Sequence, residues 1–330
     1  MELKPEIPAN QRMTIRLVYD VPEFVKWESD WLHYLLWDFD VQPILDPDHC
    51  VVDDNVILAA SSSSPGRAKL LKQHLQAFER RGLKVGLFHL SDECDASPVD
   101  IYDHADFVFR NYYRRAALRR PNCRYFAIGY KSGFTQFLTH KPISQRRYIW
   151  SFAGQPKSNR ADMLEQASTV PGGYHHLTTK WDDPGGLNTA QYAELLTDTV
   201  FALCPRGNQS VDCFRFYEAL EAGAIPIVED RSTIGSVLDI LRPGGTRRIS
   251  GFHPRDLLLN LNGHGLGSYW TAAYGTDFPC PRLHSWHDLP ALIQSLDVEK
   301  ASLQIQQWWQ AYKSNLAHIV STTVKRTFPT

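Results

Sequence analysis

The sequence has no long hydrophobic run. No window of its 330 residues approaches the roughly 18 uninterrupted apolar residues that a membrane-spanning helix requires. Its N-terminal segment, MELKPEIPANQRM, also lacks the apolar stretch of a secretory signal peptide. We therefore expect no transmembrane segment in this chain. Two interpretations stay open: a soluble, cytoplasmic protein, or a chain separated from a membrane anchor.

The sequence also lacks an excess of charge of either sign. Lysine and arginine number 35, aspartate and glutamate number 36, and the net charge is −1. A protein dedicated to nucleic acid usually carries a basic excess, so no nucleic-acid partner is expected. The hydrophobic content of 43% is that of an ordinary globular protein, and the length predicts two domains.

Motifs of several chemistries are missing. The six cysteines show no CxxC spacing, which argues against zinc and gives a disulfide framework little support. No GxSxG, P-loop or GxGxxG motif supports a hydrolase, a kinase or a dehydrogenase. The DxD tripeptides Asp38–Asp40 and Asp46–Asp48 match a pattern of manganese-dependent transferases, but neither follows an apolar strand, so turns explain them better. We expect no metal and no cofactor.

Short apolar strands alternate with helices along the chain, a pattern that predicts parallel sheets covered on both faces. Strands are expected at 13–20, 55–60, 84–90, 106–110, 124–129, 146–154, 174–179, 201–204 and 224–228. Helices are expected after a capping box at 20–23 and at 66–82, 160–167, 189–197 and 298–324. We therefore predict an α/β fold with two Rossmann-like domains that face a central cleft. The predicted boundaries are 1–145, 146–297, and a C-terminal helix at 298–330 that can pack back on the first domain.

The most informative stretch is Phe201–Asp230, FALCPRGNQSVDCFRFYEALEAGAIPIVED. It predicts an apolar strand, a polar loop that contains Gly207 and Asn208, a helix with Ser210 as its N-cap and Gly223 at its end, and a second strand. Backbone N–H groups and a helix N-terminus then point beyond the strand end, where open α/β sheets bind anions. We infer a phosphate site.

The charged side chains of this stretch fit a nucleotide. Arg206 can neutralise a diphosphate through its planar fork of donors. Asp212, Arg215 and Glu218 recur every three residues and so occupy neighbouring helix positions. A carboxylate there can accept two hydrogen bonds from a ribose diol. The alternative is a surface ion pair between Arg215 and Glu218, but loops between buried strands more often hold ligands.

LCPRG is followed by the pattern D-x-x-R-x-x-E-A-L-x-x-G-A-I-P-I, and SFAGQPKSNRADML precedes both in the chain. The first stretch is similar to the C-terminal signature of the exostosin family of glycosyltransferases, and the second is similar to the start of that family's second domain. The similarity is close over Tyr148–Asp230, while FHLSDE and VFRNYY resemble exostosin-like xylosyltransferases. The resemblance implies a GT-B fold, a nucleotide-sugar donor and no metal.

The same resemblance implies roles for individual residues. Arg160 and Arg206 would face the donor diphosphate and Glu218 the ribose, while Arg215 would orient Glu218 or contact phosphate. The second domain would bind the nucleotide and the first would supply the acceptor site. The chain is shorter than the polymerising members, so we expect transfer of a single sugar, with xylose suggested by the relatives.

An inverting transferase needs a base that removes the proton of the acceptor hydroxyl. LFHLSDE places Asp92 and Glu93 just past the carboxyl end of an apolar strand, where such sheets hold ligands. We predict that one of the two is the base, with a preference for Asp92, and that the other positions the substrate or caps a helix. A loop of capping acids without a catalytic role is the alternative.

Two further residues are acceptor-side candidates. Arg110 follows DFVF at a strand end and can bind an acceptor or the donor phosphate. His89 lies within a strand and is expected to be packed or hydrogen-bonded. The six arginines within 110–124 are expected to line a solvated helix face.

These observations predict a metal-independent, inverting glycosyltransferase that moves one sugar from a UDP-sugar to a carbohydrate acceptor. Two alternatives stay open: a non-catalytic nucleotide- or carbohydrate-binding module of the same fold, and a GT-B sugar-nucleotide epimerase.

Overall fold

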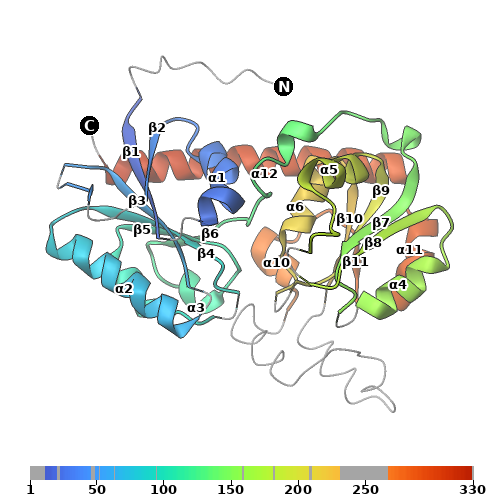
Figure 1. The fold of residues 1–330 in the computed structure, drawn as a ribbon, viewed down its shortest axis with the longest axis horizontal. Coiled ribbons are helices and arrows are strands. Elements are labelled where there is room, and N and C mark those ends of the chain that lie inside the picture. Colours follow the sequence, from blue (N-terminus) through green and yellow to red (C-terminus); the bar gives the residue numbers. More distant parts are fainter. Residues whose placement is uncertain are drawn as a thin grey trace, which may run out of the picture. The chain divides into compact units, whose positions relative to one another are not determined.

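The computed structural model describes residues 12–328 except 21–22, 46–48, 52, 63, 94, 158–159, 181–182, 208–209 and 231–266, and the side chains of 23–26 also lie outside it. The chain divides into two compact units. The first contains the described parts of Met1–Tyr112, Ala116–Ala127 and Tyr312–Thr330. The second contains those of Tyr113–Arg115 and Ile128–Ala311. Each unit is an α/β structure built on its own parallel sheet, which confirms the predicted fold class (Figure 1).

The first unit contains a six-stranded sheet with the order β2-β1-β3-β4-β5-β6, and its pairings are parallel. Every residue of β3 and β4 is buried, as in a parallel sheet with helices on both faces. The strands are β1 (Thr14–Tyr19), β2 (Asp40–Ile44), β3 (Val56–Ser61), β4 (Val85–Leu90), β5 (Phe107–Arg110) and β6 (Cys123–Tyr125). The helices are α1 (Glu23–Leu35), α2 (Pro65–Arg80), the 3-10 helix η3 (Val99–His104) and α3 (Arg115–Leu118).

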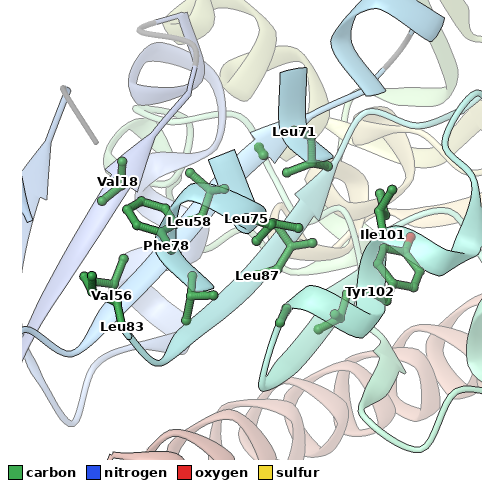
Figure 2. Close-up of a cluster of buried hydrophobic side chains, with 14 of the residues drawn as sticks. Val18, Val56, Leu58, Leu71, Leu75, Phe78, Leu83, Leu87, Ile101 and Tyr102 are labelled. Atoms are coloured by element: carbon green, nitrogen blue, oxygen red, sulfur yellow. The ribbon is translucent and has the colours of Figure 1, made fainter. Parts of the chain in front are cut away.

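Helix α2 shows how the sequence builds one covering layer. Ser64 caps its N-terminus by accepting a backbone N–H hydrogen bond, and Pro65 occupies the first turn, where its missing N–H costs nothing. Leu71, Leu75 and Phe78 recur at helical spacing and are buried, as predicted. Figure 2 shows these side chains packed with residues of β3, β4 and η3.

Strand β2 was not expected from the sequence. Its five residues, DVQPI, include the polar Asp40 and Gln42, and Pro43 has no N–H to offer a neighbouring strand. The structure accommodates Pro43 because β2 is an edge strand that pairs only with β1.

The second unit contains a five-stranded sheet with the order β11-β10-β9-β7-β8, again with parallel pairings. Its strands are β7 (Tyr148–Gly154), β8 (Gly173–Leu177), β9 (Thr199–Cys204), β10 (Ile225–Glu229) and β11 (Arg282–Leu283). Its helices are α4 (Arg160–Ser168), α5 (Thr189–Thr197), α6 (Phe214–Glu221), α10 (Tyr269–Tyr274) and α11 (Leu289–Ser295), with 3-10 turns η4 (Thr135–Phe137), η5 (Ile143–Gln145) and η6 (Trp286–Asp288).

The predicted C-terminal helix is α12 (Val298–Thr327). Its residues up to Ala311 belong to the second unit, and those from Tyr312 belong to the first. Within the second unit, Trp309 is fully buried and donates to Glu221 of α6 at 2.9 Å.

Candidate functional site

The strand order of the second unit's sheet has a topological switch point between β7 and β9. The chain runs from β7 to β8 on one side and then returns to place β9 on the other side of β7. In open parallel sheets, ligands bind beyond the carboxyl ends of the strands at such a switch point. The segments that leave these two strand ends carry Arg160 and Arg206, two of the predicted donor-binding residues.

Arg160 connects the two segments. Its Nη1 donates to the carbonyl oxygen of Gln155 at 3.1 Å, and its Nη2 donates to that of Arg206 at 2.8 Å and, at 3.5 Å, to that of Gly207. Arg160 is buried. Burial first, and the positive charges of Arg215 and Arg206 next, lower its pKa to about 10. The guanidinium therefore remains charged at neutral pH.

Arg215 lies in the first turn of α6 and reaches back to β7. Its guanidinium carbon lies 5.0 Å from the centre of the Phe152 ring, and its Nη2 donates to the carbonyl oxygen of Ala153 at 3.3 Å. Its Nε atom is buried and has no hydrogen-bond partner among the described residues. A buried donor in this condition costs about 1–3 kcal/mol. A ligand that supplied an acceptor here would relieve that cost.

Two of the arginines at this switch point, Arg160 and Arg215, have no ion-pair partner within the described chain. Arg206 lies close enough to lower the pKa of Arg160. Buried charges in proteins are normally paired, so Arg160 and Arg215, with Arg206 close to Arg160, indicate a site for an anion.

Glu218 lies one turn further along α6. It is 6% exposed, and its Oε1 accepts a hydrogen bond from the Lys131 N–H at 3.4 Å. Burial raises its pKa to about 7, against the opposing effects of the Lys131 N–H and the Arg215 charge. Arg215 thus favours the ionised form of Glu218, the form that can accept hydrogen bonds from a diol. The ribose contact itself stays a prediction.

The helix after β9 begins later than the sequence predicted. Cys213 occupies the N-cap position of α6, so Ser210 is not the N-cap and Asp212 precedes the helix. Ser210 closes a turn instead: its carbonyl oxygen accepts from the Gly207 N–H at 2.7 Å, and its hydroxyl accepts from the Asp212 N–H at 3.1 Å. The N–H of Gly207 is therefore already used inside the loop. Asn208 lies outside the described residues.

Asp212 has an environment that the sequence did not indicate. It is 1% exposed, and its two carboxylate oxygens accept from the hydroxyls of Tyr217 at 2.7 Å and Tyr269 at 2.8 Å. Because both oxygens already accept hydrogen bonds, we assign Asp212 a structural role in which it links α6 to α10. Glu218 stays the candidate for binding the ribose. Tyr269 was missed because it belongs to no motif and lies far along the chain, on α10.

In the first unit, Asp92 and Arg110 form a buried ion pair. Oδ2 of Asp92, after β4, lies 2.8 Å from Nη1 of Arg110, the last residue of β5, and the side chains are 0% and 1% exposed. Asp92 also accepts from the backbone N–H groups of Ala96 at 2.7 Å and Ser97 at 3.4 Å. Protonation of this carboxylate would weaken all of these bonds. Its burial therefore argues against Asp92 as the base, and we carry forward its half-buried neighbour Glu93.

His89, on β4, belongs to the same buried network. Its Nδ1 lies 3.2 Å from Nη1 of Arg110 and 2.6 Å from the hydroxyl of Tyr102. A guanidinium can only donate, so Nδ1 accepts and Nε2 carries the proton that is shared with Ser62 Oγ. The polar atoms of His89 and Arg110 thus form hydrogen bonds that stabilise the loop after β4. We therefore do not assign these residues to acceptor binding.

The first DxD tripeptide is also engaged in the fold. Oδ2 of Asp38 accepts from Ser321 Oγ at 2.6 Å and forms an ion pair with Lys325, both on α12. The second tripeptide, residues 46–48, lies outside the described residues. Within the described part of the chain, no group of three or more His, Cys, Asp and Glu side chains could hold a metal ion. No described helix has both the length and the apolarity needed to cross a membrane.

Comparison with known proteins finds a family model that matches this region. Residues 133–243 match the family model described as RXYLT1 C-terminal domain, a range that includes Arg160, Arg206, Arg215 and Glu218. Two relatives are named ribitol-5-phosphate xylosyltransferase 1. The Danio rerio protein is 22% identical over 195 residues, which is 56% of this chain and 39% of its own length. The Homo sapiens protein is 26% identical over 132 residues, which is 38% of this chain and 24% of its own length. The matched regions thus cover less than half of either relative.

A solved structure of similar fold is an alpha-glucosyltransferase in complex with UDP and a 13-mer DNA containing a central A:G mismatch. The TM-score is 0.50 at 11% identity, with 94% of this chain and 100% of the other chain covered. At this identity the likeness concerns the fold, and membership of the exostosin family stays a prediction. The chain has the GT-B fold, built from two Rossmann-like α/β units, and it is similar in sequence to glycosyltransferases.

Proposed function

We propose that this chain is a glycosyltransferase that binds a UDP-sugar at the carboxyl ends of β7 and β9 and transfers the sugar to a carbohydrate acceptor. The observation that carries the proposal is the arginine cluster of Arg160, Arg206 and Arg215 at the switch point. A diphosphate fits it because its oxygens accept charge-assisted hydrogen bonds and its negative charge balances the guanidinium groups. The family match over this region and the UDP in the structure of similar fold support the choice of ligand.

In the proposed reaction, the acceptor oxygen forms a bond to the anomeric carbon from the face opposite the diphosphate. The bond from that carbon to the diphosphate breaks, and its electron pair leaves with the diphosphate, so the configuration inverts. The arginine cluster stabilises the negative charge that develops on the leaving group. We propose that no metal ion is needed for this, because the arginine cluster would supply positive charge to the departing phosphate. A carboxylate of the first unit removes the acceptor proton, and Glu93 is the candidate that sequence motifs suggest.

The relatives support one sugar in particular. Both are named as xylosyltransferases, so we propose xylose as the transferred sugar and UDP-xylose as the donor. Transfer of a single residue fits this name better than polymerisation.

The proposal is tested first by UDP binding, measured by isothermal titration calorimetry. Arg160→Ala and Arg206→Ala should each raise the Kd for UDP at least about tenfold, because a hydrogen bond to a charged group contributes about 1.5–3 kcal/mol. Arg147→Ala is the matched control, since Arg147 is an exposed arginine of the same unit, and its Kd should stay within about twofold of the wild type. Equal affinity in all three variants, or no binding of UDP by the wild type, would contradict the proposed site.

Transfer is then measured with UDP-xylose and UDP-glucose against a panel of glycosides. Binding of UDP without transfer from any donor would favour the non-catalytic module. Release of an altered free sugar without an acceptor would favour the epimerase.

A further inference from the structure

The sheet of the first unit also has a switch point, between β1 and β3. The chain leaves β1 to form β2 on one side and then β3 on the other, so both carboxyl ends lie at the same edge of the sheet (Figure 1). The general rule for open α/β sheets therefore predicts a ligand beside the ends of these two strands. Sequence motifs had drawn attention to the end of β4, which is one strand further along.

Buried polar atoms without partners gather around the end of β1. The Tyr19 hydroxyl, Oδ2 of Asp20 and Oε2 of Glu28 are each buried and have no hydrogen-bond partner among the described residues. Tyr19 is 1% exposed and Glu28 is 3% exposed. A buried polar group in this condition costs about 1–3 kcal/mol, and native proteins contain few of them. Three around one strand end therefore need an explanation.

The contacts of these residues place them on the two sides of the strand end. Asp20 faces β3, because its Oδ1 accepts from the Ser61 N–H at 3.3 Å. Tyr19 faces α1: burial first, and the charges of Glu28 and Asp30 next, raise its pKa. Tyr19 is the last residue of β1 and Asp20 follows it, so two of the unpartnered polar groups lie at the strand end where the switch point predicts a ligand, and the charge of Glu28 acts on Tyr19.

The chemistry of these atoms selects a class of ligand. Two carboxyl groups and a phenol can hydrogen-bond with the hydroxyl groups of a carbohydrate, which both donate and accept. A hydrocarbon would leave the polar atoms without partners, and an anion would be repelled by the ionised carboxylate of Asp20. A neutral, hydroxyl-rich ligand fits this site.

We propose that this strand end is the acceptor-sugar site and that Asp20 is the catalytic base. In the transfer step, Oδ2 of Asp20 takes the proton of the attacking hydroxyl as its oxygen bonds to the anomeric carbon, and the diphosphate leaves with the electron pair of the broken bond. Glu28 and Tyr19 hold neighbouring hydroxyl groups of the acceptor. This inference rests on the proposed glycosyl transfer, and it replaces Glu93 as the base.

The ionisation of the two carboxyl groups suits these roles. Burial raises the pKa of Asp20 to about 6, with the Ser61 N–H and the Arg67 charge acting against it, so Asp20 is ionised at pH 7 and able to accept a proton. Burial raises the pKa of Glu28 to about 8, so at pH 7 it is mostly protonated and can donate to a sugar oxygen. Environments that separate two carboxyl groups in this way are typical of acid and base pairs.

The kinetic test compares Asp20→Asn, Glu28→Gln and Glu93→Gln with the exposed control Asp53→Asn. Asp20→Asn should lower kcat about 10²–10⁴-fold while the Kd for UDP is unchanged, the effect expected for loss of a general base. Glu28→Gln should mainly raise the acceptor KM, and Asp53→Asn should retain activity, while Glu93→Gln should lower kcat less than Asp20→Asn does. Full activity of Asp20→Asn, or loss of activity only in Glu93→Gln, would overturn the assignment.

A second measurement does not depend on turnover. Saturation-transfer NMR tests the binding of methyl glycosides of xylose, galactose, glucose and N-acetylglucosamine to the wild type and to the double variant D20N/E28Q. At least one glycoside should bind the wild type and bind the double variant at least about tenfold more weakly. Binding of none to the wild type, or equal binding to both proteins, overturns the acceptor site. If the wild type does not bind UDP, this would instead count against the proposed function of the second unit.

Discussion

Nη2 of Arg160 donates a 2.8 Å hydrogen bond to the backbone carbonyl oxygen of Arg206. This bond ties the segment after β7 to the segment after β9, the two strand ends between which the predicted diphosphate binds. The same guanidinium donates to the carbonyl oxygen of Gln155, so a single side chain fixes both segments and also supplies positive charge. A variant that keeps the positive charge but lacks the planar guanidinium is needed to separate the hydrogen bonds from the charge.

Arg160→Lys is that variant. An ammonium is a point charge on a flexible stem and cannot span the two carbonyl oxygens as a planar guanidinium does. We expect the Kd for UDP to rise about tenfold although the charge is kept, and the melting temperature to fall by a few degrees. Titration calorimetry and thermal unfolding measure the two effects, with Arg147→Lys as the control. An unchanged Kd would show that Arg160 acts through charge alone.

Glu218→Gln should change how stability depends on pH. The pKa of Glu218 is raised to about 7 in the folded state from an ordinary 4.5, so the folded state binds the proton more tightly than the unfolded state. The free energy of unfolding of the wild type should therefore fall as the pH rises from 4.5 to 7, and the loss is complete above pH 7. Glutamine does not ionise, so the variant should be more stable than the wild type at pH 8, by up to about 3 kcal/mol, and similar at pH 4.5.

Urea unfolding at pH 4.5, 6 and 8 measures this difference. Glu221→Gln, on the same helix, is the control. The same pH slope in wild type and Glu218→Gln would show that Glu218 is not desolvated as the structure indicates. If Glu218 also binds the ribose, the variant should lose affinity for UDP while it gains stability.

The parts of the fold that could be predicted are those set by local sequence. Helix α5 begins at Thr189 as expected, because Asn188 and Gln191 form a capping box that is visible in the sequence. The helix α6 ends before Gly223, whose φ of +70° suits glycine. By contrast, the prediction of Ser210 as the N-cap was wrong, because Ser210 forms its hydrogen bonds within its own turn.

The candidate site could be predicted only where its residues lie in one motif. Arg160 and Arg206 lie in recognisable motifs, and the structure brings Arg160 to the backbone of Arg206 in the second unit. The burial of Asp92 could not be foreseen, because its partner Arg110 lies 18 residues away and on another strand. Asp20 looked like a helix-capping residue, and only the pairing of β1 with β3 shows that it stands at a switch point. Spatial neighbours of this kind become visible only when the strand order is known.

Arg110→Met should destabilise the first unit strongly. It leaves the buried carboxylate of Asp92 without its ion-pair partner, which typically lowers the free energy of unfolding by about 3–5 kcal/mol. The double variant Arg110→Met/Asp92→Leu also removes the buried charge of Asp92 and should recover part of the loss. Asp95, whose Oδ1 lies 2.8 Å from Nη2 of Arg110, loses this ion pair in both variants. Urea unfolding of the wild type, the single variants Arg110→Met and Asp92→Leu, and the double variant gives the coupling energy by a double-mutant cycle. Additive effects of the two substitutions would contradict a tightly coupled pair.

Chelation should leave transfer intact. The proposed site stabilises the leaving diphosphate with arginines, so EDTA should change the initial rate by less than about twofold. Initial rates of sugar transfer before and after EDTA treatment test this. Complete loss of activity that manganese restores would show that a metal ion supplies charge at the site.

The dependence of the transfer rate on pH should follow the ionisation of Asp20. A base must be unprotonated, so with a pKa raised to about 6 the value of kcat/KM should fall about tenfold for each pH unit below 6. An ordinary carboxylate would place this limb near pH 4. The groups that set the position of the limb are the Ser61 N–H and the Arg67 charge, which lower the pKa of Asp20 against its burial. Arg67→Gln should therefore move the limb to higher pH, because it removes a charge that favours the ionised base. A limb near pH 4 in the wild type, or no movement in Arg67→Gln, would show that another group takes the proton.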